Sequence, residues 1–354
     1  MRSTVAVLGA GAWGTAVAKV IADKGHNAVI WCYEKETAEE INTHHVNERF
    51  LPGVKLPSGI IALTDIIEAA SEKEFLILAV PSLFLISIVK QLLTVPSILE
   101  GKTSIAVITK GFLDTPKGPA LILDTLEDYL PGFYRNALVY IAGPSHAEEV
   151  AQGKITGLIS ASRSPKNAIR FRYLLKSSRL LVFASLDVCG VQVAAAAKNV
   201  IAIAFGIMDA LKTEPGEAEE MFGDNTESLL LAAGLNEIQT LGMAMGATHR
   251  ETFSSISGVG DLDVTCRSIY GRNRRFGREI VEKNILEPFK DLNDLLNRIG
   301  EIGYLPEGAA AAKCVKILAK KYQLKIPIST GLYQILNKEI KPLEFLQNFL
   351  GNLN

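Results

Sequence analysis

The sequence has little that would suggest a strongly charged partner or an oxidising compartment. Its 354 residues include 37 lysines and arginines and 38 aspartates and glutamates, a formal net charge of −1, so we expect no nucleic acid as a ligand. Only four cysteines occur, Cys32, Cys189, Cys266 and Cys314, and none of them forms a Cys-x-x-Cys pair. The first apolar run begins at residue 4, and we expect no signal peptide. We therefore expect free thiols and a cytoplasmic location.

Long apolar runs are scarce as well. Residues 188–208 alone approach the length of a membrane span, and Gln192, Lys198 and Asn199 interrupt that run. A lysine at the centre of a span costs about 2.5–3.5 kcal/mol on insertion scales, so we expect a buried core helix and no integral membrane segment. The adjacent histidines at 44–45 lack Cys, Asp or Glu partners at ligand spacing, and we expect no metal site.

A glycine-rich segment is the most informative feature that is present. Gly9-Ala-Gly-Ala-Trp-Gly14 directly follows an apolar run at residues 4–8 and opens a helical stretch at residues 12–24. Gly9 permits a tight turn, Gly11 lets the backbone approach a pyrophosphate, and Gly14 lets the helix pack on its strand. Free amides at the positive end of the helix dipole would bind the pyrophosphate. The segment predicts a dinucleotide site, and the alternative is the same turn without a ligand.

Glu34 supports the dinucleotide interpretation. It follows a second apolar run at residues 28–31, and it comes twenty residues after Gly14. An acidic side chain at the end of the second strand is suited to bind a ribose diol. The carboxylate of Glu34 would repel a 2′-phosphate, whereas Lys35 could attract one, so we favour NAD as the cofactor and leave NADP open.

The rest of the first half alternates short apolar runs with helical segments. Runs at residues 75–80, 105–109 and 138–142 are each followed by polar or turn residues. This alternation predicts an α/β fold of Rossmann type, with a mostly parallel, doubly wound sheet covered by helices on both faces. Such sheets bind ligands beyond the carboxyl ends of their strands, where Lys110, Gly143 and Ser145 fall.

The second half has the pattern of helices. From about Cys189, apolar residues recur at helical spacing over residues 191–211, 226–245, 275–283, 292–299, 308–322 and 331–337. We therefore predict a dinucleotide-binding domain over residues 1–188 and an all-α substrate and catalytic domain over residues 189–354. An acidic stretch at residues 212–220 is predicted to be a solvated loop.

Lys198 stands out in the first of these helices because it is a cation in the largely apolar run 193–203. Burying an ammonium group without a partner is costly. Ala194 and Ala202, one turn to either side, leave room beside it for a ligand. Partial desolvation lowers the pKa of an ammonium group, as proton transfer near neutral pH requires. Two interpretations stay open: a lysine that transfers protons, and one that pairs with a core carboxylate or reaches solvent.

A third cluster lies at residues 258–277. Its glycines bracket Asp261, and Gly271 is followed by Arg272 and Asn273 at a predicted helix start. Arginine forms bidentate, charge-assisted bonds to phosphate, and asparagine adds a donor of fixed geometry. We interpret the cluster as a site for a small molecule that bears a phosphate. The alternative is a surface helix with a basic first turn, which the helix dipole opposes.

These segments together resemble the NAD(P)-dependent glycerol-3-phosphate dehydrogenase family over essentially the full chain. The resemblance rests on the order and spacing of several motifs: the glycine-rich segment, Phe50-Leu-Pro-Gly53, Val80-Pro81, Thr109-Lys110-Gly111, Ala142-Gly143-Pro144-Ser145, Ala197-Lys198-Asn199-Val200, Gly260-Asp261-Leu262 with Thr265-Cys266, and Arg272-Asn273-Arg274. The chain departs from many bacterial relatives at Ala12 and Gly271, where they often have serine, and in a longer, more acidic stretch at residues 212–222.

The resemblance implies reversible hydride transfer between sn-glycerol 3-phosphate and dihydroxyacetone phosphate, with a nicotinamide cofactor. It implies that Lys198 exchanges the proton of the substrate hydroxyl and that Lys110 stabilises negative charge on that oxygen. Asp261 would orient Lys198, while Arg272 and Asn273 would hold the phosphate. The other substrate contacts that it implies are Gly143, Ser145, Asn199, Thr265 and Gly271.

The cofactor contacts are implied in the same way. They are Gly9, Gly11, Ala12, Trp13, Gly14, Tyr33, Glu34, Phe84, Lys110, Ala147, Arg272, Leu305 and Glu307. For Phe84, as for Phe50, a place in the hydrophobic core is the alternative.

The resemblance also implies a homodimer that supplies glycerol 3-phosphate for phospholipid synthesis. Two other functions stay open: a two-domain reductase of another small hydroxy or keto acid, and a non-catalytic NAD-binding regulator. Arg272 with Lys110 favours a phosphate over a bare carboxylate, and a regulator would have no need of Lys110, Lys198 and Asp261 together. His146 is a weaker candidate general acid, because its neighbours in sequence place it behind the substrate contacts.

Overall fold

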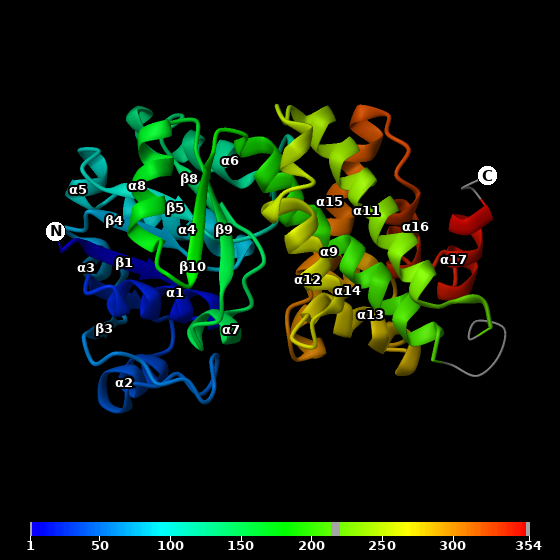
Figure 1. Ribbon diagram of the computed structural model, residues 1–354, viewed down its shortest axis with the longest axis horizontal. Coiled ribbons are helices and arrows are strands. Elements are labelled where there is room, and N and C mark those ends of the chain that lie inside the picture. Colours follow the sequence, from blue (N-terminus) through cyan, green and yellow to red (C-terminus); the bar gives the residue numbers. More distant parts are fainter. Residues whose placement is uncertain (1, 214–219, 352–354) are drawn as a thin grey trace. The chain divides into compact units, whose positions relative to one another are not determined.

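The computed structural model describes residues 2–213 and 220–351, which divide into two compact units (Figure 1). The first unit contains the residues up to Leu113 together with Leu121–Val188, and the second contains Asp114–Ala120 and the chain from Cys189 onward. The predicted domains differ from these units in the short segment Asp114–Ala120, and their boundary at residue 188 stays a prediction. Most of the acidic stretch at residues 212–220 lies outside the described residues.

The first unit is built on an eight-stranded sheet. In sheet order its strands are β10 (Leu180–Ser185), β9 (Thr156–Ala161), β8 (Val139–Ala142), β5 (Ser104–Val107), β4 (Phe75–Leu78), β1 (Thr4–Leu8), β2 (Asn27–Trp31) and β3 (Ile60–Leu63). Neighbouring strands run parallel, except for the antiparallel pair of β8 and β9. The predicted Rossmann-type, mostly parallel sheet is confirmed.

Helices cover both faces of this sheet. They are α1 (Ala12–Asp23), α2 (Lys35–His44), α3 (Ile66–Ala70), α4 (Ser82–Leu92), α5 (Pro96–Leu99), α6 (Ile122–Tyr129), α7 (Ala147–Ala151) and α8 (Pro165–Leu175). Val5 and Val7 of β1 share one core with α1, α2, α7 and α8. The alternate residues Ala6 and Leu8 point the other way and are also 0% exposed, and α3 packs there against β1 and α4.

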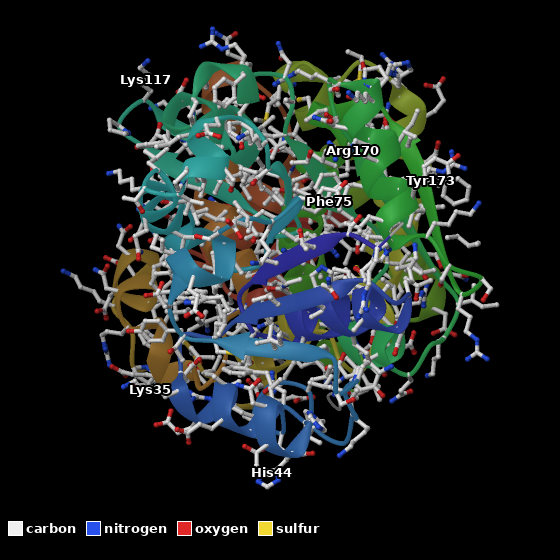
Figure 2. The ribbon with its side chains drawn as sticks, turned by 90° about the vertical axis from the view of Figure 1, so that its left-hand side faces the viewer. Lys35, His44, Phe75, Lys117, Arg170 and Tyr173 are labelled. Carbon is white, nitrogen blue, oxygen red and sulfur yellow. The ribbon has the colours of Figure 1, made fainter. Side chains whose placement is uncertain are left out.

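Aromatic packing holds a helix against the sheet at the start of β4 (Figure 2). The guanidinium carbon of Arg170, on α8, lies 4.8 Å from the ring centre of Phe75, which begins β4 (Figure 2). The Phe75 ring also meets Phe171 edge-on, with 5.1 Å between the ring centres. These contacts hold α8 on the sheet at the end opposite the carboxyl ends of the strands.

The order of the strands reverses between β1 and β4. The chain runs from β1 through α1 to β2 on one side, whereas β4 lies on the other side of β1. The segments that follow these two strands come close together, because a Cβ on Gly9 would lie 2.9 Å from the carbonyl carbon of Ala79. Open α/β sheets bind ligands beyond the strand ends at such a point.

The second unit is formed mainly by helices. They are α9 (Val188–Leu211), α11 (Asp224–Met245), α12 (Asp261–Arg267), α13 (Arg272–Glu282), α14 (Leu292–Asn297), α15 (Glu307–Tyr322), α16 (Pro327–Leu336) and α17 (Pro342–Gly351). They confirm the all-α character predicted for this part of the chain, although α17 was not among the predicted helices. The segment Asp114–Ala120 forms most of a separate two-stranded sheet, which consists of β6 (Phe112–Thr115) and β7 (Gly118–Leu121).

Helix α9 forms the core of the second unit. It has the length and composition of a membrane span, yet 94% of its most apolar window is buried inside the protein, as predicted for a core helix. Its polar side chains Gln192, Lys198, Asn199 and Asp209 are buried too, at 7% exposure or less. Buried polar groups need partners, and the partners of these residues define the site described below.

Candidate active site

The glycine-rich turn has the geometry of a pyrophosphate site. Gly9 ends β1 with a φ of +122°, in the region that favours glycine. A Cβ on Gly14 would lie 2.0 Å from the carbonyl oxygen of Gly9, so a side chain there would separate α1 from β1. A Cβ on Gly11 would meet no atom within 4 Å, and Gly11 caps α1 without a side-chain hydrogen bond. The turn therefore presents helix amides across open space, which fits the pyrophosphate of NAD or NADP.

Asn47 holds this turn in place, although it was not among the predicted site residues. Its side chain is fully buried, and its Nδ2 atom donates to the carbonyl oxygen of Ala10 and to Oγ1 of Thr15, both at 2.8 Å. Thr15 Oγ1 donates in turn to the Ala10 carbonyl at 3.1 Å. A polar residue three positions before the Phe50-Leu-Pro-Gly53 motif was the signal available for Asn47.

Of the residues predicted at the adenosine end, Tyr33 and Glu34 directly follow β2, and Phe84 lies on α4 after β4. Glu34 caps α2, and its carboxylate lies 3.6 Å from Nη1 of Arg49. The guanidinium carbon of Arg49 lies 5.0 Å from the ring centre of Phe50, which is half-buried. Tyr33 is 82% exposed and Phe84 is 57% exposed, so the core alternative for Phe84 is wrong. Exposed aromatic rings of this kind are suited to contact a ligand.

Lys110 lies beyond the carboxyl end of β5, beside the residues that follow β8. Its Nζ atom donates to the carbonyl oxygen of Gly143 at 3.3 Å, and Ser145 Oγ donates to the same oxygen at 2.9 Å. Ala147 is buried at the start of α7, and His146 caps that helix. The sheet thus brings Lys110, Gly143 and Ser145 together as the sequence predicted.

Lys198 is bound to Asp261 inside the second unit. Its side chain is 5% exposed and that of Asp261 is 1% exposed, and they form a short ion pair. Lys198 Nζ also donates to Oγ1 of Thr265 at 2.7 Å, and that hydroxyl donates to the Asp261 carbonyl oxygen at 2.6 Å. Lys198 is therefore paired with a core carboxylate and does not reach solvent, and its part in proton transfer stays a prediction. The Asp261 carboxylate and the Thr265 hydroxyl together hold the ammonium group in one orientation.

Asn199 has a donor that the described residues leave unsatisfied. The side chain is 3% exposed, and its Nδ2 atom has no hydrogen-bond partner in the described part of the chain. A buried donor without a partner costs about 1–3 kcal/mol. An acceptor oxygen on a bound molecule would remove this cost. The unpaired amide of Asn199, the residue directly after Lys198, therefore indicates a ligand at this site.

The first turn of α13 presents Arg272 and Asn273. Gly271 caps the helix, and the Oδ1 atom of Asn273 accepts from the backbone N–H of Gly308 at 2.9 Å. This contact fixes the orientation of the amide, because only an oxygen can accept from an N–H, and it leaves Nδ2 as the end available to a ligand. Arg272 is exposed and has no ion-pair partner among the residues described. A free cation at a helix N-terminus is a site suited to an anion.

The segment before α15 carries the last two predicted residues. Leu305 and Glu307 are both half-buried, and Glu307 begins α15. The neighbouring Tyr304 donates a short hydrogen bond to Glu279 of α13. Within the second unit, this contact holds the segment against the later part of α13, and the Gly308–Asn273 hydrogen bond joins the start of α15 to the first turn of α13.

Comparisons with known proteins agree with these motifs. Family models described as the N-terminus and C-terminus of NAD-dependent glycerol-3-phosphate dehydrogenase match residues 4–168 and 187–347. The chain is 56% identical to glycerol-3-phosphate dehydrogenase (NAD(P)+) of Treponema denticola over 99% of both chains. It is 38% identical to the enzyme of the same name from Bacillus velezensis, with 94% of this chain and 89% of the relative covered.

A solved structure gives the same result. The crystal structure of glycerol-3-phosphate dehydrogenase from Coxiella burnetii is 29% identical, covers 99% of both chains and superposes with a TM-score of 0.83. The predicted resemblance is confirmed, and the chain belongs to the NAD-dependent glycerol-3-phosphate dehydrogenase family.

Proposed function

We propose that this chain is an NAD(P)-dependent sn-glycerol-3-phosphate dehydrogenase, which interconverts glycerol 3-phosphate and dihydroxyacetone phosphate. The observation that carries the proposal is the buried Lys198–Asp261 pair beside the unsatisfied amide of Asn199, in the same unit as the anion site at Arg272. A buried lysine suits proton transfer to an oxygen, and a free arginine at a helix N-terminus suits a phosphate.

Each residue has a distinct part in this proposal. Lys198 gives a proton to the substrate oxygen during reduction and takes it back during oxidation. Asp261 and Thr265 hold the ammonium group of Lys198 in one orientation through the contacts described above. Arg272 and the Nδ2 atom of Asn273 bind the phosphate. Gly143, Ser145 and Asn199 are proposed substrate contacts as well, together with Thr265 and Gly271.

The cofactor would be held by the glycine-rich turn and by residues after β2. The open space at Gly11 and the free amides of α1 fit a pyrophosphate, and Glu34 fits a ribose diol. The bound nicotinamide supplies or accepts the hydride. Lys110 is proposed to contact both substrate and cofactor, and the remaining cofactor contacts are proposed at Ala12, Trp13, Tyr33, Phe84, Ala147, Leu305 and Glu307.

Direct absorbance assays of the nicotinamide cofactor test this proposal. Purified protein is mixed with dihydroxyacetone phosphate and either NADH or NADPH, and oxidation of the nicotinamide is followed. We expect turnover by the wild type and a loss of about 10²–10⁴-fold in Lys198→Ala, the range that general acid–base catalysis supplies. Lys320→Ala, which removes an exposed lysine of α15, is the matched control and should retain wild-type rates.

The same assay separates the alternatives that the sequence left open. A reductase of another small keto acid would oxidise NADH with that acid and not with dihydroxyacetone phosphate. A non-catalytic regulator would bind NADH, seen as a change in its fluorescence, and turn over neither substrate. Folded, NADH-binding wild-type protein without turnover of dihydroxyacetone phosphate would overturn the proposal.

We further propose that the protein is a cytoplasmic homodimer that supplies glycerol 3-phosphate for phospholipid synthesis. All four cysteines are free thiols, which supports a reducing compartment. Light scattering of the purified protein tests the dimer, and a monomeric mass at micromolar concentration would exclude it. Depletion of the protein in its own cells should lower the glycerol 3-phosphate pool.

A further inference from the structure

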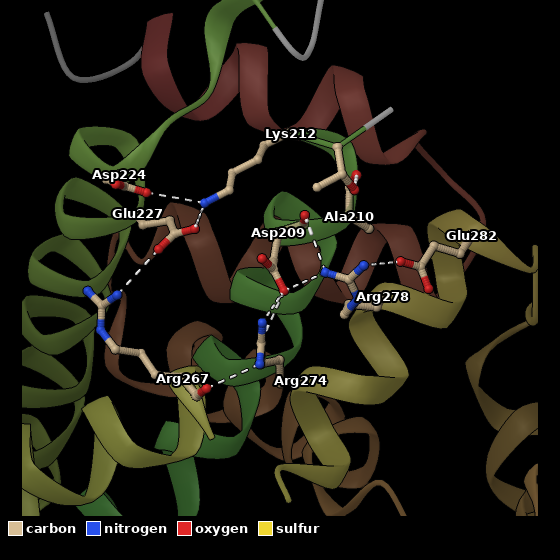
Figure 3. A network of polar contacts seen from close by, with 10 residues as sticks. Asp209, Ala210, Lys212, Asp224, Glu227, Arg267, Arg274, Arg278 and Glu282 are labelled. Carbon is tan, nitrogen blue, oxygen red and sulfur yellow. Dashed lines mark hydrogen bonds and ion pairs between the residues drawn. The ribbon is translucent and has the colours of Figure 1, made fainter. Parts of the chain in front are cut away.

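Asp209 is a buried carboxylate that the proposed reaction does not use. It lies in the last turn of α9 and is 7% exposed. Its Oδ2 atom accepts from Arg274 through Nε at 3.1 Å and Nη2 at 2.5 Å, and from Nη1 of Arg278 at 2.7 Å (Figure 3). Both arginines lie on α13, one helical turn apart. Asp209 therefore clamps the face of α13 that meets α9.

The charge on Asp209 is stabilised by these contacts. Burial alone would raise the pKa of its carboxyl, but hydrogen bonds from Arg278 and Arg274 outweigh burial and hold the pKa below its ordinary value. The carboxylate is thus ionised at neutral pH. Removing one partner of a buried, hydrogen-bonded charge pair leaves the other charge uncompensated.

Helices α9 and α13 also touch backbone to backbone. A Cβ on Gly206 of α9 would lie 2.1 Å from the carbonyl oxygen of Arg274, and a Cβ on Gly277 of α13 would lie 2.1 Å from that of Ile203. Glycine at both positions permits this close approach. Because no side chains separate the two backbones at these glycines, α13 could rotate slightly on α9, and this rotation would move its first turn. The contacts of Asp209 with Arg274 and Arg278 oppose that rotation.

Arg274 extends the clamp to α12. Its Nη1 atom donates to the carbonyl oxygen of Arg267 at 3.1 Å, at the end of α12 (Figure 3). Arg267 itself reaches the buried Glu227 of α11 at 3.3 Å. Asp209 and Arg274 thus join three helices: α9 carries Lys198, α12 carries Asp261, and α13 begins with Arg272 and Asn273.

We propose that Asp209 is a positioning residue, which holds the first turn of α13 so that Arg272 and Asn273 bind the phosphate of the substrate in register with Lys198. The inference rests on the proposed function. Asp209 touches no reacting atom, and it acts through Arg274, the residue directly after Asn273. Its loss should weaken the binding of the phosphate group more than it slows proton transfer.

Steady-state kinetics of Asp209→Asn test the proposal. We expect the KM for dihydroxyacetone phosphate to rise about tenfold, which corresponds to the loss of a charge-assisted interaction. The KM for NADH and the kcat at saturating substrate should stay within about twofold of wild type, a split that general loss of structure would not produce. Asp209→Glu, which keeps the charge, should recover part of the affinity.

Glu282→Gln is the matched control. Glu282 is the other carboxylate bound to Arg278, but it lies toward the end of α13 and away from its first turn. This variant removes a negative charge from the same network and should leave the KM for dihydroxyacetone phosphate unchanged. If it raises that KM as much as Asp209→Asn does, the effect is one of net charge and the proposal is wrong.

A binding measurement without turnover separates this inference from the proposed function. Inorganic phosphate should raise the Tm of the wild type, because a ligand bound by the folded state stabilises it. Asp209→Asn should lose most of that rise, and Arg274→Lys, which keeps the charge but not the paired donors, should lose it as well. An unchanged phosphate response in both folded variants would overturn the positioning role, whether or not the wild type reduces dihydroxyacetone phosphate.

Discussion

Removing the charges of Lys198 and Asp261 one at a time and then together separates folding from catalysis. In Lys198→Met the Asp261 carboxylate, 1% exposed, loses its ammonium partner, and in Asp261→Asn the ammonium loses its carboxylate. Breaking a buried ion pair by removing one partner costs about 3–5 kcal/mol. The double variant carries neither charge and should lie within about 1–2 kcal/mol of wild type, because replacing a whole buried pair is often close to neutral.

The assay is urea unfolding followed by two signals. Both tryptophans, Trp13 and Trp31, belong to the first unit, so tryptophan fluorescence reports on that unit. Far-UV circular dichroism is dominated by helix and weights the second unit. We expect each single variant to lower the midpoint seen by circular dichroism much more than the midpoint seen by fluorescence.

Turnover completes the test. The double variant should be folded and still lose about 10²–10⁴-fold in rate, because Lys198 is absent. If the double variant has no higher free energy of unfolding than the single variants, the two residues do not act as a buried charge pair. Retained turnover in a folded double variant would refute the assignment of Lys198 as the proton donor.

Three further predictions concern other parts of the chain. Gly11→Ala should fold normally and weaken NADH binding, measured by fluorescence titration, because its Cβ fills the open space at the turn, whereas Gly14→Ala should destabilise the first unit. Glu34→Gln should raise the preference for NADPH over NADH, and Arg49→Gln should lower it, judged by the ratio of the two kcat/KM values; unchanged ratios would exclude this pair as a determinant. Burial raises the pKa of Glu237 above its ordinary 4.5, despite hydrogen bonds from Ser329 and Ile328. The folded state therefore binds more protons than the unfolded state, so the resulting stability is complete below pH 4.5 and is lost as the pH rises through the folded pKa. In Glu237→Gln the urea midpoint should fall less as the pH rises from 4.5 than it does in the wild type. An equal fall in both proteins would show that Glu237 is not the source of this pH dependence.

Features with a local physical cause were predictable from the sequence. The glycine-rich turn follows from three glycines at fixed spacing after an apolar run, and the strands next to it are continuous apolar segments because both faces of the sheet are covered. The exchange of short strands for helices after Cys189 is likewise visible in the spacing of apolar residues. Such patterns also carried the family resemblance.

Strands at one edge of the sheet were not predicted, for a physical reason. On β10, Leu181 and Phe183 are 39% and 46% exposed, so its apolar residues do not mark one buried face. β9 pairs antiparallel with β8, so the connection between these two strands is not the parallel crossover that the alternation of strands and helices predicts. The pattern rules that identify buried parallel strands do not apply at this edge.

Polar contacts between distant residues were beyond the reach of the sequence. Asn47 reaches a turn more than thirty residues earlier, and Asp209 reaches Arg274 across sixty-five residues. Neither residue has a neighbour in sequence that reveals its partner. Only the fold brings the partners together, and burial then makes each contact necessary.

The basic cluster on α13 shows how such contacts create a specific site. By residue type alone, Arg272, Arg274, Arg275 and Arg278 are equivalent cations on one short helix, and the sequence distinguishes Arg272 only by its place at the helix start. In the structure Arg274 and Arg278 pair with Asp209, and Arg275 pairs with Glu279 at 3.0 Å. Among the described residues no acidic partner is seen for Arg272, so the unbalanced positive charge of the helix is concentrated at its first turn. There the helix dipole adds to it, and a phosphate is the ligand that this arrangement favours.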